Sequence, residues 1–419
     1  MEMFTKCDIF TPNNISYQMC SYLIPNGNLL EPSVGKGCLL KGVDLDVYDS
    51  VDVYDIKQEF LNDINQSGVN KFCGDFLSVD VSMKYVNIIM NPPYIKFQDL
   101  SHEYRSFIKS KFPILAKGCI DIYYAFIIKC IDLLRDNGVM VSITPNSFLY
   151  NKSAIELRKY LFENRYIQEI IDFKSEKVFP DASVYCCITI FTKTKPDTLV
   201  YNGIPIQYTD ICNRNNYMLF TPITDGHAQN KTKTLKNVCK ISNGIATLRD
   251  KVYIHNTRLF NEPCWQEITN SRRVKYAIYP YEDGKIICDD RFKSENPQTY
   301  VYLEKFRDEL GKRDNGRKRY PTWYAYGRSQ SLHLSNVKRV IFIPAFLHPD
   351  NICLTISKPM IHQTCLCIEP NNDDDVEAIY SAIMSNATYL GNVSSKRSGG
   401  WVNITTRTLY SIPFVSNIC

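Results

Sequence analysis

Apolar residues in the first half of the chain form short runs that alternate with amphipathic stretches. Runs with the composition of β-strands lie at 29–30, 50–54, 86–90, 139–144 and 184–192. Between the later runs, an amphipathic stretch at 120–136 is stopped by Asn137-Gly138, and Ser153 with Glu156 forms a capping box that opens a helix to about Asn164. The alternation predicts an α/β fold with a mainly parallel sheet covered by helices on both faces. Ligands bind such sheets at the carboxyl ends of the strands.

The residues that follow the first predicted strands suit a nucleoside ligand. The loop 31–37 (EPSVGKG) contains two glycines, so its backbone can approach a ligand closely. Asp55 follows the second strand, where a carboxylate can accept hydrogen bonds from both ribose hydroxyls. Asp75 offers a carboxylate for an adenine amino group, and Phe76 offers a ring to stack on it. Taken singly, these features are also compatible with a plain turn or a solvated strand end.

The strand at 86–90 runs into Asn91-Pro92-Pro93-Tyr94, the most informative motif of the chain. An exocyclic amine such as N6 of adenine attacks a methyl donor poorly, because its lone pair is delocalised into the ring. The Asn91 side-chain oxygen and the Pro92 carbonyl can accept hydrogen bonds from the amine, and Tyr94 offers an aromatic face for a base. Asn-Pro also starts ordinary turns, but the preceding strand and the following tyrosine favour the catalytic interpretation.

Charge divides the chain into two halves. Residues 1–195 carry 21 Lys and Arg against 23 Asp and Glu, whereas the remaining residues carry 28 against 21. The surplus is densest at 312–319 (KRDNGRKR), and aromatic residues follow it closely. A basic run alone is typical of a solvated loop, but the interleaved aromatics and the methylating motif upstream favour nucleic-acid binding. The length of 419 residues favours two to three domains. With the change in charge near Lys195, we expect two domains, 1–196 and 197–419.

Cysteine spacing and hydropathy argue against several other classes of protein. None of the 16 cysteines forms a Cys-x-x-Cys pair, so neither a zinc site nor a disulfide scaffold is expected. The first nine residues lack the apolar stretch of a signal peptide. The longest apolar run, 123–134, is interrupted by Lys129 and Asp132, so no membrane span is expected. We expect a cytoplasmic protein, nucleoid-associated through DNA, from a cell or from a virus in its host.

In their order and spacing, these motifs resemble the γ-class adenine-N6 DNA methyltransferases of type II restriction-modification systems, with the TaqI-type enzymes as the nearest model. The resemblance runs from Phe10-Thr11-Pro12 to Val178-Phe179-Pro180 and implies a Rossmann-like S-adenosyl-L-methionine-dependent domain with a mixed, mainly parallel sheet. The residues it implies for cofactor binding are Thr11, Glu31, Pro32, Gly35, Gly37, Asp55, Ile56, Asp75, Phe76 and Asn91. Those it implies for catalysis are Asn91, Pro92, Tyr94 and Phe179. The rings of Tyr94 and Phe179 are expected to hold the target base between them. Because the resemblance begins so early in the chain, no nuclease domain is expected upstream.

The second half resembles, less specifically, the α+β target-recognition domain of such enzymes. The resemblance rests on 244–253 (GIATLRDKVY), 279–281 (YPY), 323–330 (WYAYGRSQ) and 398–401 (SGGW). Each segment is also compatible with plain β-rich packing. The residues that we expect to bind double-stranded DNA are Lys312, Arg313, Arg317, Lys318, Arg319, Trp323, Tyr326, Arg328 and Gln330.

The resemblance implies methyl transfer to N6 of an adenine that is flipped out of duplex DNA, with protection of that DNA from a cognate restriction endonuclease. A monomer without a metal ion or membrane contact is expected. Two alternatives remain. Asn-Pro-Pro-Tyr also serves enzymes that methylate the glutamine amide of release factors at N5, but these lack a basic second half. A non-catalytic DNA-binding protein would be expected to lose Asn91 or the glycine loop, and both are present.

Overall fold

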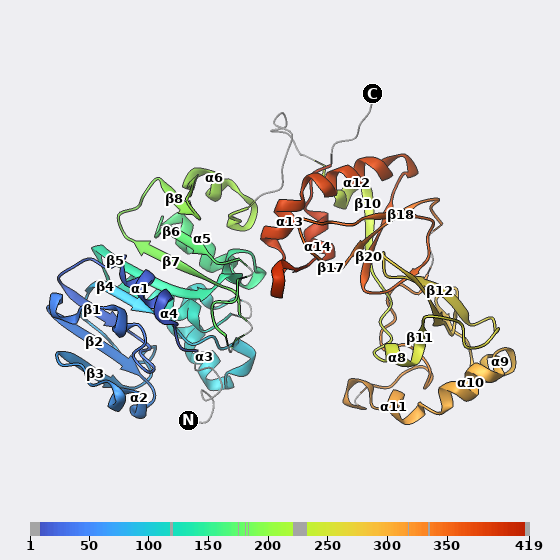
Figure 1. Ribbon diagram of the computed structural model, residues 1–419, viewed down its shortest axis with the longest axis horizontal. Coiled ribbons are helices and arrows are strands. Elements are labelled where there is room, and N and C mark those ends of the chain that lie inside the picture. Colours follow the sequence, from blue (N-terminus) through green and yellow to red (C-terminus); the bar gives the residue numbers. More distant parts are fainter. Residues whose placement is uncertain are drawn as a thin grey trace. The chain divides into compact units, whose positions relative to one another are not determined.

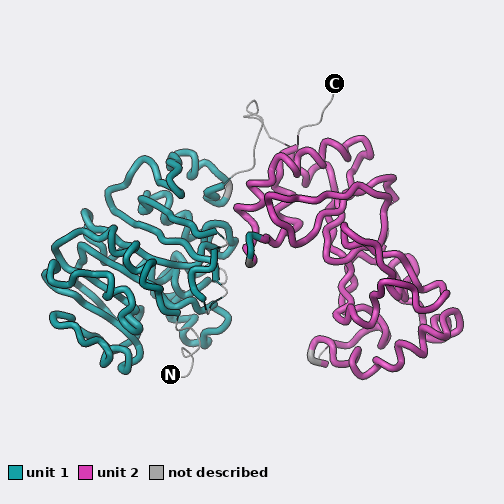
Figure 2. The backbone as a smooth tube through the Cα atoms, viewed as in Figure 1, with its two compact units in different colours: residues 1–221, 398–400 teal, residues 222–397, 401–419 magenta. Residues whose placement is uncertain are grey.

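The computed structural model describes residues 9–117, 120–174, 176–180, 182, 184–220, 233–316, 318–333 and 336–414. The chain divides into two compact units (Figure 2), residues 1–221 with 398–400 and residues 222–397 with 401–419. The predicted division at 196/197 differs from this one. The reason is that strand β8 (Thr198–Tyr201) pairs with β6 (Ile167–Asp172) and so extends the sheet of the first unit.

A nine-stranded sheet forms the centre of the first unit, in the order β3-β2-β1-β4-β5-β7-β6-β8-β9 (Figure 1). Its other strands are β1 (Asn28–Glu31), β2 (Ser50–Asp55), β3 (Val69–Cys73), β4 (Tyr85–Met90), β5 (Leu134–Pro145), β7 (Cys186–Thr192) and β9 (Ile204–Gln207). Strands β1 to β5 are parallel, whereas β7 is antiparallel to both β5 and β6. The predicted α/β class and mainly parallel sheet are confirmed.

Alternate residues of the central strands face opposite layers of the unit. Leu29 and Ile89 are buried in the layer that contains α1, whereas Leu30 and Ile88 are buried in the layer that contains α4 and α5. This division follows from the two-residue period of a β-strand. The helices of the unit are α1 (Asn13–Cys20), α2 (Gln58–Asp63), α3 (His102–Lys111), α4 (Tyr123–Leu133), α5 (Ile155–Glu163) and α6 (Tyr208–Asn213).

Two local predictions are wrong. Helix α4 ends at Leu133, and Asn137-Gly138 lie inside β5, where the pairing with β4 shifts register. A Cβ on Gly138 would lie 2.7 Å from the carbonyl oxygen of Val86, so a close approach of two strands explains this glycine. Helix α5 begins after a 3-10 turn with Ala154 as its N-cap and without a side-chain cap, so the predicted capping box does not form.

The second unit has the α+β character that the sequence predicts. One antiparallel sheet has the order β10-β20-β16-β18, a second sheet the order β11-β13-β12-β19, and smaller sheets complete the unit. The strands are β10 (Cys239–Asn243), β11 (Ile254–His255), β12 (Trp265–Thr269), β13 (Val274–Ile278), β14 (Tyr281–Glu282), β15 (Lys285–Ile286), β16 (Val340–Pro344), β17 (Phe346–Leu347), β18 (Thr355–Ser357), β19 (Ile361–His362), β20 (Cys365–Pro370), β21 (Ser395–Lys396) and β22 (Val402–Asn403). The helices are α7 (Leu235–Val238), α8 (Asp250–Tyr253), α9 (Asp289–Glu295), α10 (Pro297–Glu304), α11 (Arg307–Gly311), α12 (Val376–Ser385), α13 (Ala387–Val393) and α14 (Thr406–Tyr410). Throughout the described ranges of the chain, no helix is long and apolar enough to cross a membrane.

Candidate active site

A cleft opens at the carboxyl ends of β1, β2 and β4. The chain runs outward from β1 to β2 and β3 and then returns to β4 on the other side of β1. The loops that leave β1 and β4 therefore diverge, and this topological switch point is where α/β sheets bind ligands. The cleft contains about 980 Å³ of space between atoms, part of it open to solvent.

Most of the predicted site residues line this cleft. They are Thr11, Glu31, Pro32, Gly35, Asp55, Ile56, Asp75, Phe76, Asn91, Pro92 and Tyr94. Gly37 and Phe179 do not line it. The sequence prediction missed other lining residues, among them Cys38, Lys57, Phe60, Tyr104 and Phe126. These come from loops and helices whose approach to the cleft depends on the tertiary fold.

Asp55 ties two loops of the cleft together. Its Oδ2 accepts a hydrogen bond of 2.9 Å from the Gly35 amide, and its Oδ1 accepts one of 2.8 Å from the Lys57 amide. Gly35 has a φ of +51°, a left-handed conformation that glycine adopts at little cost. Each carboxylate oxygen has further acceptor capacity. Asp55 can therefore hold both loops and still accept hydrogen bonds from a bound ribose.

Glu31 places a second carboxyl group in the wall of the cleft. It is 1% exposed, and its Oε2 has no hydrogen-bond partner among the described residues. Burial, together with the nearby charge of Asp55, holds the pKa of the Glu31 carboxyl well above its ordinary value. A buried carboxylate with an unused acceptor is costly unless a donor or cation reaches it. The Glu31 side chain is thus suited to a positively charged ligand.

Asp75 and Phe76 form the third part of the cleft. Asp75 accepts a hydrogen bond of 3.0 Å from the Leu77 amide and one of 2.8 Å from the Tyr104 hydroxyl. The buried ring of Phe76 stacks on Phe126 with a centroid distance of 5.7 Å. This pair of residues can offer an acceptor and an apolar surface to a purine, as the sequence predicts. Nothing in the local sequence marks Tyr104, which reaches Asp75 from α3.

The amide of Asn91 is held in one orientation by the start of the described chain. Its Nδ2 donates hydrogen bonds of 2.8 Å to the Ile9 carbonyl and 3.1 Å to the Thr11 hydroxyl. Because a carbonyl oxygen only accepts hydrogen bonds, the Ile9 contact identifies the nitrogen end of the amide. The oxygen Oδ1 then lies on the opposite side. Ser33 also donates to the main-chain carbonyl of Asn91 at 3.0 Å, which joins the loops after β1 and β4.

Tyr94 and Phe179 meet each other directly. Their ring centroids are 6.4 Å apart with an interplanar angle of 65°, an edge-to-face contact. The Tyr94 hydroxyl donates to the Ile143 carbonyl at 3.0 Å, and Phe179 is buried in the layer that contains α1. Because the two rings contact each other, no base fits between them in this conformation, and the rings would have to separate before a base could enter.

Comparisons with known proteins find similarity to restriction-modification methyltransferases. Residues 43–179 match the Eco57I restriction-modification methylase family. The type II methyltransferase M.HindII of Haemophilus influenzae is 26% identical over 469 aligned positions, which cover 97% of this chain and 88% of that protein. The type II methyltransferase M.AccI of Acinetobacter calcoaceticus is 28% identical over 210 positions, which cover 46% of this chain and 38% of that protein. The chain is a relative of the type II restriction-modification methyltransferases.

Two solved structures share the fold of this chain over most of its length. The DrdV–DNA complex aligns with a TM-score of 0.50 and 11% identity, covering 86% of this chain and 49% of that chain. A nuclease-deletion mutant of the Type ISP restriction-modification enzyme LlaGI, in complex with a DNA substrate mimic, aligns with a TM-score of 0.51 and 12% identity, covering 97% and 45%. This chain therefore spans about half the length of each solved chain, and at such identities the likeness shows the fold alone.

S-adenosylmethionine is the methyl donor of this class of enzyme, and the residues of the cleft fit it. The donor carries a sulfonium and an amino group, which match the buried carboxyl of Glu31. Its ribose hydroxyls match Asp55, and its adenine matches Asp75 and Phe76. All four residues line the same cleft.

The raised pKa of Glu31 predicts that cofactor binding strengthens as the pH rises. Below that pKa the carboxyl of the free protein is neutral, so a cationic ligand must first displace its proton. The apparent affinity should then rise up to about tenfold per pH unit, because it scales with the ionised fraction, and should level off above the pKa. Calorimetric titration with S-adenosylmethionine across the pH range from about 5 to 8 measures this slope. Glu31→Gln should remove it, and an unchanged slope in that variant would assign the proton to another group.

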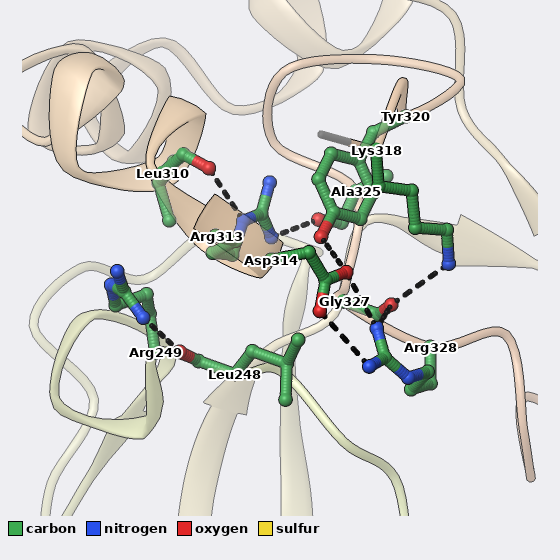
Figure 3. Close-up of polar contacts among 10 residues, drawn as sticks. All are labelled: Leu248, Arg249, Leu310, Arg313, Asp314, Lys318, Tyr320, Ala325, Gly327 and Arg328. Carbon is green, nitrogen blue, oxygen red and sulfur yellow. Dashed lines mark hydrogen bonds and ion pairs between the residues drawn. The ribbon is translucent and has the colours of Figure 1, made fainter. Parts of the chain in front are cut away.

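The predicted DNA-binding residues of the second unit differ in exposure, and Figure 3 shows three of them, Arg313, Lys318 and Arg328. Arg313 and Tyr326 are buried, at 1% and 3% exposure. The Arg313 guanidinium donates to the carbonyls of Leu310 at 2.7 Å, Ala325 at 2.5 Å and Trp323 at 3.0 Å. It therefore fastens the loop that follows α11 and is engaged too fully to bind a phosphate. The Tyr326 hydroxyl likewise donates to a strand carbonyl, that of Ile278, at 2.6 Å.

The other predicted residues divide by exposure. Those that are exposed are Lys312, Lys318, Arg319, Arg328 and Gln330. Trp323 is half-buried, and the guanidinium of Arg307 lies over its ring at 4.9 Å from the centroid. Arg317 lies outside the described residues. The exposed set keeps the predicted basic character of this part of the second unit.

Proposed function

We propose that this protein transfers the methyl group of S-adenosylmethionine to N6 of an adenine in duplex DNA. The observation that carries the proposal is the fixed amide of Asn91, whose nitrogen is engaged by Ile9 and Thr11. That arrangement leaves the side-chain oxygen as an acceptor, and both Asn91 and Pro92 line the cofactor cleft. Two acceptors beside a methyl-donor site suit a nitrogen nucleophile that carries two hydrogens.

The residues contribute through position and polarity. S-adenosylmethionine supplies an electrophilic methyl group bound to a sulfonium. As N6 forms its bond to that methyl carbon, the carbon–sulfur bond breaks and positive charge develops on N6. Asn91 Oδ1 and the Pro92 carbonyl accept hydrogen bonds from N6 and stabilise this charge, and N6 then releases one proton to solvent. Because the two acceptors are preorganised, little reorientation is needed during the reaction.

Duplex DNA as the substrate is supported by the second unit and by the relatives. The similarity to M.HindII extends over 97% of the chain and so includes the basic second half. Enzymes that methylate release factors resemble only the catalytic domain. We also propose that the exposed cations Lys312, Lys318 and Arg319 contact DNA phosphates, that the protein acts as a monomer, and that it protects DNA from a cognate endonuclease.

Base extrusion gives Tyr94 a testable role. An adenine must leave the helix to reach the cleft, at a cost of a few kcal/mol. If Tyr94 turns from its contact with Phe179 and stacks on the base, Tyr94→Ala should weaken capture about 5- to 100-fold, since stacking is worth about 1 to 3 kcal/mol per base. Tyr94→Phe keeps the ring and should be mild. Fluorescence of 2-aminopurine at the target position measures capture of the extruded base. Equal signals from Tyr94→Ala and Tyr94→Phe would show that the Tyr94 ring does not stack on the base.

Sequencing of genomic DNA from a methylation-deficient host that expresses the protein tests the function as a whole, with detection of modified bases. We expect N6-methyladenine at one short sequence. N4-methylcytosine in its place would retain the chemistry of an exocyclic amine but overturn the choice of base. An absence of modified bases, together with methylation of a release factor by the purified protein, would favour the alternative enzyme class.

A further inference from the structure

Two loops of the second unit lie side by side and hold each other through hydrogen bonds. The amide of Gly327 donates to the Thr247 carbonyl, and the amide of Arg328 donates to the Ala246 carbonyl, each at 3.1 Å. A Cβ at position 327 would lie 2.3 Å from Cγ of Leu248, so only glycine lets the loops meet this closely. The pairing fixes the backbone from which the side chain of Arg328 projects.

Asp314 holds the guanidinium of Arg328 from one end (Figure 3). Arg328 Nη1 donates to Oδ2 of Asp314 at 2.7 Å, and Nη2 donates to Oδ1 at 3.0 Å. The hydroxyl of Tyr320 donates to Oδ2 of the same carboxylate at 2.7 Å. These hydrogen bonds lower the pKa of Asp314 to about 2, with the Arg328 contact as the largest cause, so the carboxylate is ionised at neutral pH.

The remaining donors of Arg328 form a second fork. Nη1 donates its other hydrogen to the Gly327 carbonyl, at 2.8 Å. Nε and the second hydrogen of Nη2 take no part in these bonds. In a planar guanidinium these two hydrogens are parallel and point to the same side. The Arg328 side chain is 44% exposed.

We propose that Arg328, oriented by Asp314, reads a guanine in the major groove of the DNA substrate. The inference rests on the proposed function, because it requires duplex DNA to be the ligand. The Hoogsteen edge of guanine presents N7 and O6 as adjacent acceptors, and a bidentate arginine contact to them is the commonest specific contact between proteins and DNA. Asp314 thereby determines specificity without touching the base.

The charge of Asp314 favours a base over a phosphate as the ligand. A phosphate is an anion, and a carboxylate bonded to the same guanidinium repels it. The N7 and O6 acceptors of guanine belong to a neutral base, so the Asp314 carboxylate repels them far less. Arg319, which is also exposed, provides the contrast, because we expect it to bind a phosphate.

The test is selection of duplexes by the full-length protein, followed by replacement of each selected guanine with 7-deazaguanine, which lacks the N7 acceptor. We expect one position at which 7-deazaguanine weakens binding by the wild-type protein about 5- to 100-fold, the usual contribution of a bidentate contact. Arg328→Ala should bind the guanine and 7-deazaguanine duplexes equally at that position while still discriminating elsewhere. Arg328→Lys, which keeps the charge and loses the fork, should behave like Arg328→Ala. Asp314→Asn should reduce the same preference.

Arg319→Ala is the matched control. We expect it to weaken binding to all sequences alike and to lower the slope of log affinity against log salt by about one, as loss of a phosphate contact does. If Arg328→Ala gave this uniform pattern, or changed nothing, the assignment of Arg328 to a guanine would be overturned. Methyl transfer by the wild-type protein is measured separately, so a protein that methylates no DNA would refute the proposed function while the binding data still decide the role of Arg328.

Discussion

Asn91→Ala should lower the single-turnover rate of methyl transfer about 100- to 1,000-fold, the usual effect of losing one preorganised polar contact at a reacting centre. Cofactor affinity should change little, because the Asn91 main-chain carbonyl, which accepts from Ser33, is retained. The fold should also survive, since the Asn91 side chain is only half-buried. Rapid-quench measurement with enzyme in excess over a DNA duplex that contains the target site separates the chemical step from product release.

Asn62→Ala is the matched control, because Asn62 is exposed at the end of α2 in the same unit. It should methylate at the wild-type rate. A wild-type single-turnover rate in Asn91→Ala, with intact cofactor binding, would show that the acceptor on Asn91 is not needed for the reaction. The proposed chemistry would then be wrong.

Asp55→Ala should weaken the binding of S-adenosylmethionine by at least about tenfold. A hydrogen bond to a charged group contributes about 1.5 to 3 kcal/mol, and the substitution also releases the amides of Gly35 and Lys57 that shape the cleft. Calorimetric titration with the cofactor measures the loss. Asp55→Asn should also bind S-adenosylmethionine weakly, because the amide nitrogen of asparagine would face an N–H donor.

Asp63→Ala removes an exposed carboxylate from the end of α2 and controls for the change in net charge. Its cofactor affinity should equal that of the wild-type protein. If Asp55→Ala bound S-adenosylmethionine as tightly as Asp63→Ala did, the cofactor would have to lie elsewhere in the cleft.

The cofactor cleft could be predicted from sequence because its main residues follow buried strands. Glu31, Asp55 and Asn91 each stand at or next to the carboxyl end of a parallel strand, and the topology brings those ends together. Apolar runs of β-branched residues reveal such strands in a single sequence. Strand β3 was not predicted in this way, because four of its five residues are exposed and its composition resembles that of a loop.

Side-chain roles that depend on tertiary contacts could not be predicted in this way. Arg313 lies in the most basic run of the chain, yet it binds three backbone carbonyls in the interior. A charged residue is rarely buried unless its donors are satisfied, and carbonyls at 310, 323 and 325 come together only in the folded loop. The role of Tyr104 could not be predicted for the same reason, because its partner Asp75 lies far away in the sequence.

The hydrogen bonds from Asn91 to Ile9 and Thr11 affect the strength of its oxygen as well as its direction. When the nitrogen of an amide donates hydrogen bonds, electron density moves towards the carbonyl oxygen, which becomes a stronger acceptor. The partners of the nitrogen therefore tune the basicity of the opposite end of the same group. In this protein the methyl-accepting nitrogen would meet an oxygen whose electronic character is set by two residues on the far side of the amide.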